Sequence, residues 1–389
     1  MRNAIVCALL VSWIASAGAP HLRPDLDPMP TDIGPTYVEI DGQIYGAQPS
    51  ELGPIGGGEG YSRIITGGDY NVSNIDEARE ALAQAQAGEV VYLDPDGNYS
   101  CTALVFAEDF VIEIPEGVTL ASNRGHNGSR GAVVFSDAHA TDPLIRPLGP
   151  NVRVTGIWLR GPKPQWHIEH HRRSFTMDDE GNYVHHDEEG PRGGHAYYYR
   201  FPTSGAIRLE HEDIEIDNCE ISGWTRGVLV RGVRNAHIHH NYIHHQQYQG
   251  LGYGVSHSDA RSLIEYNLFD ANRHSIAATG QPGDAYEARH NVELYVARSF
   301  PFDMHGGRDR GDGTDIAGDW VRIHNNQFRA TDQRAIGIRG VPQEPSTVRN
   351  NWFYHGEPGG NVMMPWPCGE DTNITFEDNA FGKDEPEAR

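Results

Sequence analysis

The chain has 389 residues and a formal net charge of −23, because it carries 54 acidic and 31 basic residues. This acidity excludes duplex DNA and anionic membranes as default partners, since both require clustered positive charge on the protein. The 45 glycines and 24 prolines indicate many short turns rather than long helices. Lysine occurs only at positions 163 and 383, so a mechanism with a lysine base has almost no candidate.

The first residues are typical of a secretory signal. Met1-Arg2 precedes an apolar run over 4–14 and three small residues at 15–17, and the run is too short to span a bilayer. We therefore expect a secreted or periplasmic protein that lacks residues 1–17 and begins with an extended segment over 18–60. The remaining cysteines permit at most one disulfide: Cys101, Cys219 and Cys368.

An amphipathic helix is expected next. Ser73 followed by Asp76 resembles a capping box, and an apolar stripe runs from Ile75 to Ala85 before Gly88. Apolar segments then predict the first strands, at 90–93, 111–114 and 118–121. A helix in this place would cover the open end of a core built from repeated strands, as terminal repeats require.

A repeated pattern dominates the rest of the chain. Apolar-x-x-Asn-x-apolar occurs around Asn241, Asn267, Asn326, Asn351 and Asn379. When imperfect copies of the pattern are included, its Asn position, called the Asn slot below, falls at residues 219, 241, 267, 291, 326, 351 and 379. This spacing predicts the turns of a parallel β-solenoid, in which the Asn amides bond the turn backbone and tolerate left-handed conformations. A β-sandwich is the alternative, but it would show turns every 8–12 residues without this longer register.

The helix, the strand segments and the repeated coils together resemble a known family of folds. The helix, the segments 114–120 and 152–156 and the Asn-containing coils resemble right-handed parallel β-helix proteins of the pectate-lyase-like superfamily, over most of residues 60–382. The resemblance implies an all-β, right-handed parallel β-helix (solenoid) with an N-terminal capping α-helix, formed by residues 61–382 and followed by a tail at 383–389. It does not fix an activity, because the superfamily includes lyases, hydrolases, epimerases and binding proteins.

Two insertions break the period. Residues 161–203 are rich in His and Tyr, including Tyr198, and we expect them to form a wall of a groove. Residues 303–319 contain Asp309, Asp312 and Asp315 around glycines, which makes a calcium site conceivable, although the spacing is not that of an EF-hand loop. No cofactor is required by the sequence.

Aligning the strand after each Asn slot predicts one outward row of polar side chains: Arg231, His257, Thr279, His305 and Arg339. Successive turns lie about 4.8 Å apart, so the row would be roughly 20 Å long. Like charges in one row are unfavourable unless an anion lies on them. We therefore expect an anionic polysaccharide as partner; the alternative is that the arginines pair with local carboxylates.

The residue types favour cleavage of a uronic-acid-containing glycan by β-elimination. This reaction needs a cation on the carboxylate, a base for the C5 proton and an acid for the leaving oxygen. The candidate catalytic residues are His257 or His305 as base, Tyr253 as acid, Arg273 on the carboxylate, with Arg231 or Arg339 as alternatives, and His274. The candidate substrate-binding residues are Arg231, Arg339, Asp303 and Tyr198. We expect a monomer without nucleic-acid or membrane partners.

Three alternatives remain open at this point. A hydrolase would use Asp303 with a second carboxylate such as Asp309, although the motifs of β-helix polygalacturonases are missing from these strands. A transition-metal site could form from Asp303, His305 and His257. A non-catalytic carbohydrate-binding or metal-handling β-helix is the third. The histidines between 237 and 245 are interpreted as surface or turn residues.

Overall fold

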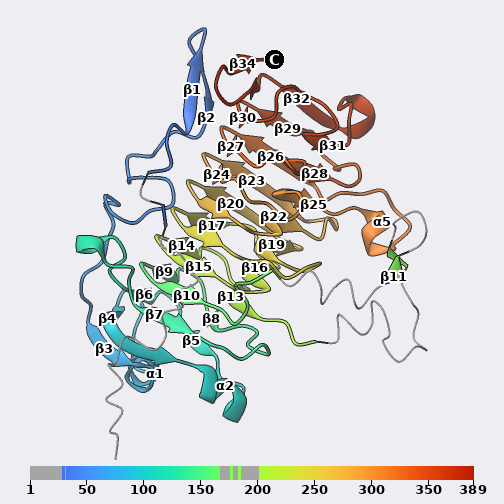
Figure 1. Cartoon of the computed structure of the whole chain (residues 1–389). Helices are drawn as coiled ribbons and strands as arrows, with labels where there is room; N and C mark the ends of the chain where they lie inside the picture. Colours follow the sequence, from blue (N-terminus) through green and yellow to red (C-terminus); the bar gives the residue numbers. More distant parts are fainter. Residues whose placement is uncertain (1–28, 31, 167–175, 178–182, 185–200) are drawn as a thin grey trace, which may run out of the picture.

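The computed structural model describes residues 29–30, 32–166, 176–177, 183–184 and 201–389. In this part of the chain, strands stack into a long solenoid with a nine-stranded sheet on one side and a 21-stranded sheet around the rest (Figure 1). Successive turns pair in parallel, so the predicted parallel β-helix is confirmed. Within the described residues no helix is long and apolar enough to cross a membrane.

The nine-stranded sheet contains β5 (Ile112–Ile114), β8 (Ile145–Pro147), β13 (Gly205–Leu209), β16 (Arg226–Arg231), β19 (Tyr253–Ser258), β22 (His274–Ala278), β25 (Phe302–Met304), β28 (Ile336–Ile338) and β31 (Met363–Met364).

The larger sheet consists of two series joined through β4 (Val90–Ser100). The first series contains β3 (Tyr70–Asn74), β6 (Thr119–Ala121), β9 (Arg153–Thr155), β14 (Glu215–Asp217), β17 (Ala236–His239), β20 (Arg261–Glu265), β23 (Ala285–Arg289), β26 (Trp320–His324), β29 (Ser346–Arg349) and β32 (Ile374–Glu377). The second contains β7 (Val133–Phe135), β10 (Trp158–Arg160), β15 (Glu220–Ser222), β18 (Tyr242–His244), β21 (Leu268–Asp270), β24 (Val292–Glu293), β27 (Gln327–Phe328), β30 (Trp352–Phe353), β33 (Ala380–Phe381) and β34 (Glu387–Ala388).

Two small antiparallel pairs and a few short helices complete the described elements. They are β1 (Tyr37–Ile40), β2 (Gln43–Gly46), β11 (Thr176–Met177), β12 (Tyr183–Val184), α1 (Ile75–Leu82), α2 (Thr102–Glu108), α5 (Gly307–Arg310), η1 (His126–Gly128) and η2 (Glu370–Thr372). The three cysteines Cys101, Cys219 and Cys368 are free thiols.

Helix α1 lies at the N-terminal end of the solenoid, where its apolar face covers the core (Figure 1). Its N-cap is Asn74, one residue later than the sequence predicts, and the Asn74 side chain accepts a hydrogen bond from the Glu77 amide. Glu77 in turn accepts from the backbone and hydroxyl of Ser73, so Ser73 takes part in the cap, but its partner is Glu77 and not the predicted Asp76. The helix ends at Leu82 and is therefore shorter than the stripe to Ala85 suggests.

The Asn ladder forms as predicted. Asn291 Nδ2 donates to Ile264 O at 2.9 Å and to Asn326 Oδ1 at 3.0 Å, while its own Oδ1 accepts from the Asn267 amide at 3.0 Å. The left-handed backbone, however, belongs to the residue before each Asn, as at His290 with φ 52°. The ladder asparagines lie inside the core and satisfy the turn backbone there, which fixes the rise from coil to coil.

The N-terminal segment runs along the side formed by the larger sheet (Figure 1). Gly46 N bonds Asn350 O near the C-terminal end, and Arg63 binds Glu215 several coils earlier. This segment therefore covers the face opposite to the nine-stranded sheet and leaves the latter open.

Candidate functional site

The register of the nine-stranded sheet determines which side chains point away from the core. Val228, Val255, Ile276 and Phe302 are aligned and buried, so the residues that follow them point outward: Leu229, Ser256, Ala277 and Asp303. The next outward row contains Arg231, Ser258, Thr279, His305 and Arg339. Four members of this row agree with the sequence alignment.

His257 is the exception, and its predicted outward position is wrong. It pairs with Val230 and Ala278 in the inward row and is only 1% exposed. Its Nε2 lies 2.6 Å from Ser262 Oγ, and its ring stacks on the buried Tyr286. The sequence alignment was displaced by one residue in β19, and a shift of one residue moves a side chain to the other face of a sheet.

A pocket of about 420 Å³ opens on this sheet. Leu229, Ser256 and Ala277 line it from the sheet, and Tyr253 and His305 also face it. The remaining lining residues are Arg226, Arg231, Leu251, His257, Ser258, Ala278 and Thr279. No Asp or Glu is among the described residues that line this pocket.

Asp303 lies beside the pocket and is completely buried. Arg339 holds it with two hydrogen bonds, from Nε to Oδ1 at 2.9 Å and from Nη2 to Oδ2 at 2.6 Å. His305 Nε2 is 2.9 Å from the same Oδ2, while the His305 side chain remains 24% exposed. Burial alone raises the pKa of Asp303, but the contacts with His305 and Arg339 outweigh burial and lower the pKa below its usual range. An ionised Asp303 therefore orients His305.

His274 occupies the inner side of the same cluster. It is fully buried, and its Nδ1 lies 2.5 Å from Phe300 O, which can only accept a proton, so Nδ1 carries the hydrogen. Its Nε2 has no hydrogen-bond partner and is 3.6 Å from Asp303 Oδ2. Burial, and then the charge of Arg273, lower the pKa of His274 well below its usual value, so the ring is neutral. No sequence signal pointed to the Phe300 contact.

Tyr253 and Arg273 form the other edge of the site. The Tyr253 ring stacks on His274 at 5.7 Å, and its hydroxyl donates to Gly250 O at 3.0 Å. Burial raises the pKa of Tyr253, with Arg273 opposing this shift, so the phenol stays protonated at neutral pH. Arg273 Cζ lies 5.9 Å from the Tyr253 ring centre, and Arg273 Nε and Nη1 are buried without a hydrogen-bond partner. Such donors require an acceptor from a ligand or solvent.

Two further predicted site residues are Arg231 and Tyr198. Arg231 is exposed and has no hydrogen-bond or ion-pair partner within the described residues. It lies three coils from His305, or about 14 Å at the ordinary strand spacing. Tyr198 lies outside the described residues.

The carboxylates of the acidic loop, for which the sequence suggested calcium, contact protein donors of the loop itself. Asp309 accepts from Gly306 N at 3.1 Å, and Asp312 accepts from the Thr314 hydroxyl and from Arg310. Neither of the two clusters of possible metal ligands found in the described residues includes Asp309, Asp312 or Asp315. These carboxylates instead stabilise the turn around α5.

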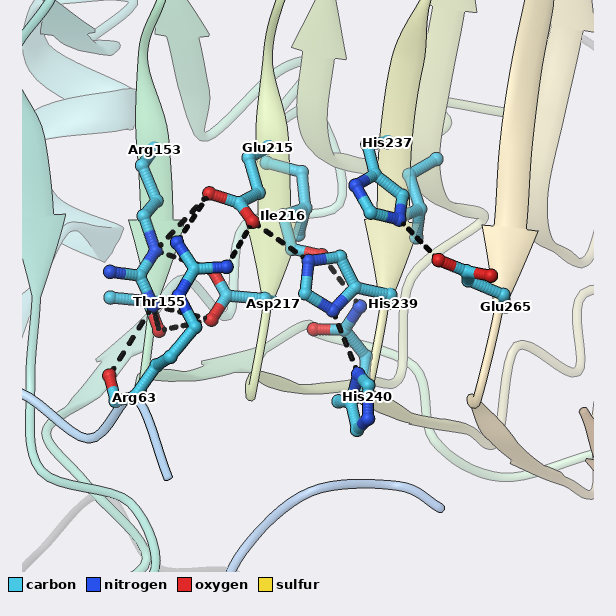
Figure 2. A network of polar contacts seen from close by, with 12 residues as sticks. Arg63, Arg153, Thr155, Glu215, Ile216, Asp217, His237, His239, His240 and Glu265 are labelled. Carbon is cyan, nitrogen blue, oxygen red and sulfur yellow. Dashed lines mark hydrogen bonds and ion pairs between the residues drawn. The ribbon is translucent and has the colours of Figure 1, made fainter. Parts of the chain in front are cut away.

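His237, His239 and His240 lie on the larger sheet or next to it, where charges are paired (Figure 2). Glu215 receives two hydrogen bonds from Arg63 and lies 2.9 Å from His239 Nε2. His237 Nε2 is 2.8 Å from Glu265. His239 and His244 are buried strand residues rather than surface or turn residues as expected, whereas His240 is buried but lies in a turn. The charges on this face are thus paired, as Arg339 is with Asp303 on the nine-stranded sheet, whereas Arg231 on that sheet is exposed.

A neighbouring network predicts an acid-sensitive contribution to stability. Glu220 is buried and binds Arg130 and His244; burial raises its pKa, but His244 and Arg130 outweigh burial and lower it to about 2. The ionised form therefore stabilises the fold above its unfolded pKa near 4, and this contribution disappears as the pH falls towards 2. We expect Glu220→Gln to reduce the free energy of unfolding by about 3 kcal/mol at pH 7.

Urea unfolding of wild type and Glu220→Gln at pH 7, 5 and 3.5 checks this prediction, with the exposed Glu80→Gln as control. The difference between wild type and variant should shrink on acidification. A difference that stays constant down to pH 3.5 would show that the carboxylate charge contributes nothing.

The comparison with known protein families agrees with this fold. The sequence model described as right handed beta helix region matches residues 199–381. The chain is a right-handed parallel β-helix. The structure of Yersinia enterocolitica family 28 exopolygalacturonase is similar at 12% identity and a TM-score of 0.39, over 77% of this chain and 65% of that one. This chain thus matches less than two thirds of that enzyme, and nothing about activity follows from the likeness. No curated protein sequence matches the chain.

Proposed function

We propose that the β-helix is a secreted or periplasmic polysaccharide lyase that cleaves a uronic-acid-containing glycan by β-elimination. The composition of the pocket carries this proposal: its described lining offers His, Tyr and Arg side chains and no carboxylate. β-Elimination uses such groups, since a cation stabilises the charge that develops on the uronate and neutral side chains transfer the protons.

His305 is the proposed base. Asp303 Oδ2 lies 2.9 Å from Nε2 and favours the tautomer with hydrogen there, which leaves the lone pair of Nδ1 to accept the C5 proton. The C4–O bond then breaks, a double bond forms between C4 and C5, and the leaving oxygen takes a proton. Asp303 and Arg339 act as positioning residues, because they are occupied by each other.

Tyr253 is the proposed proton donor to the leaving oxygen, and Arg273 beside it the proposed carboxylate ligand. Tyr253 lines the pocket, and burial keeps its hydroxyl protonated. Arg231 is too far from His305 to bind the same sugar, so it would hold the carboxylate of a sugar further along the chain. Arg339 has no free donor pair, and His257 faces the core.

The hydrolase alternative receives less support from this geometry. Hydrolysis generally requires two carboxyl groups roughly 5–10 Å apart on either side of the scissile bond. Asp303 is fully buried and bound by Arg339, so it does not reach a ligand in the pocket.

Incubation of the chelator-treated protein with a panel of uronate polymers tests the proposal, with near-ultraviolet absorbance as the readout of the unsaturated uronyl product. A rise in absorbance with at least one polymer is expected. New reducing ends without that absorbance would identify a hydrolase, and retention of a polymer without cleavage would identify a binding protein.

Replacement of the proposed acid should have a leaving-group-dependent effect. We expect Tyr253→Phe to lower the rate on the polymer by about 10²-fold or more, since a positioned acid contributes that much. With an aryl uronide, whose leaving group needs no proton, the loss should be much smaller. Tyr266→Phe on the opposite face is the control. Equal losses on both substrates would assign Tyr253 a purely structural role.

A further inference from the structure

Two buried imidazole nitrogens beside the pocket lack a hydrogen bond. His274 Nδ1 donates to Phe300 O, and its other ring nitrogen, Nε2, has no hydrogen-bond partner and faces the carboxylate of Asp303 at 3.6 Å. His305 Nε2 lies 2.9 Å from the same oxygen without the alignment of a hydrogen bond. A buried lone pair that faces a carboxylate is unfavourable unless a proton or a cation lies between them.

We propose that His274, Asp303 and His305 bind a divalent transition-metal ion of the zinc class, and that the bound metal holds the lyase inactive. The three ligand atoms lie within 4.8 Å of one another. Bonds of about 2.0–2.1 Å at tetrahedral or right angles place ligand atoms roughly 2.9–3.4 Å apart. The observed 2.9 and 3.6 Å to Asp303 Oδ2 are close to this range, so small rotations of the rings complete the site.

The residues around the cluster are those that a metal site needs. Phe300 O fixes the tautomer and plane of His274, which is the usual role of a partner behind a ligating imidazole. Arg339 fixes Asp303 through Oδ1 and also touches Oδ2, which retains a further lone pair for the metal. Two imidazoles and one carboxylate leave coordination positions open towards the pocket that His305 lines.

The second cluster of possible metal ligands differs in its hydrogen bonding and provides a control. In Glu215, His237 and His239 the carboxylate is already neutralised by Arg63, with Arg153 at 3.5 Å (Figure 2). The His237 and His239 nitrogens in this cluster contact Glu265 and Glu215. The imidazole nitrogens of this cluster thus already have hydrogen-bond partners, which His274 Nε2 and His305 Nε2 lack, and we expect no metal to bind.

The inhibitory part of the inference rests on the proposed function. A metal on His305 Nε2 displaces the hydrogen from that nitrogen, so Nδ1 becomes the protonated one. The ring then has no lone pair for the C5 proton, and the proposed base is lost. Chelation should therefore activate the enzyme, and zinc should inhibit it.

Calorimetric titration of the chelator-treated full chain with zinc chloride tests the site. One equivalent should bind, with affinity lowered by more than about 100-fold in His305→Ala and in His274→Ala, and unchanged in His237→Ala. His305→Ala keeps the test valid if the buried His274→Ala fails to fold. Absence of binding, or binding unaffected by His305→Ala, would overturn the inference.

Activity assays separate this inference from the proposed function. Lyase activity that zinc abolishes in wild type supports both. Zinc binding at the triad without any lyase activity would disprove the proposed function and leave the site standing. Activity that requires zinc would overturn the inhibitory role, and with it the assignment of His305 as base.

Discussion

Replacing His305 with glutamine is expected to lower the rate of unsaturated-product formation by about 10²–10⁴-fold, the usual contribution of a general base. Glutamine has a similar length and places an amide beside Asp303, but the amide cannot accept the C5 proton. The change should appear mainly in kcat, since His305 is assigned to proton transfer rather than to binding of the carboxylate. Near-ultraviolet absorbance of chelator-treated protein measures it.

His324→Gln is the matched control for this experiment. His324 lies on the opposite sheet beside Glu287 and away from the pocket, so its replacement should leave the rate within about two-fold, as expected for a site that touches no substrate. Thermal unfolding of both variants shows whether the fold is retained. If folded His305→Gln keeps most of the wild-type rate, another group removes the proton and the assignment of the base is wrong.

The second large effect is expected in the Asn ladder. Asn291→Ala should lower the free energy of unfolding by about 3 kcal/mol, because each buried partner left unsatisfied costs about 1–3 kcal/mol. The substitution removes the bonds to Ile264 O and Asn326 Oδ1 and the acceptor of the Asn267 amide. These partners are enclosed in the core, so water does not replace the amide.

Urea unfolding followed by circular dichroism measures this loss, with the exposed Asn361→Ala as control. The control should change stability by no more than about 0.5 kcal/mol, as is usual for surface positions. Since coils of a solenoid can unfold separately, transitions are compared by midpoint as well as by extrapolated free energy. Equal midpoints for the two variants would mean that the ladder does not hold the coils together.

Most of the fold followed from the sequence because a solenoid repeats a local pattern. The Asn slot appears once per coil, and each Asn contacts the Asn of the next coil, so its spacing in the sequence reports the geometry directly. The row Arg231, Thr279, His305 and Arg339 was predictable for the same reason. His257 was misplaced because strand boundaries cannot be read to one residue, and one residue inverts the side chain.

The sequence by itself determined the parallel coils, the capping helix and the strands that bear the candidate residues. Only the tertiary structure decided which of these residues act together. The Phe300 carbonyl accepts the Nδ1 hydrogen of His274, which leaves Nε2 as the other ring nitrogen. Arg339 binds the Asp303 carboxylate, so Asp303 positions His305 instead of contacting a ligand. Both contacts join residues on different coils at separations of 26 and 36 positions, where no local period specifies distance or orientation. The histidines over 237–245 show the same limit, because the Arg63 that neutralises their partner Glu215 comes from 152 positions earlier in the chain.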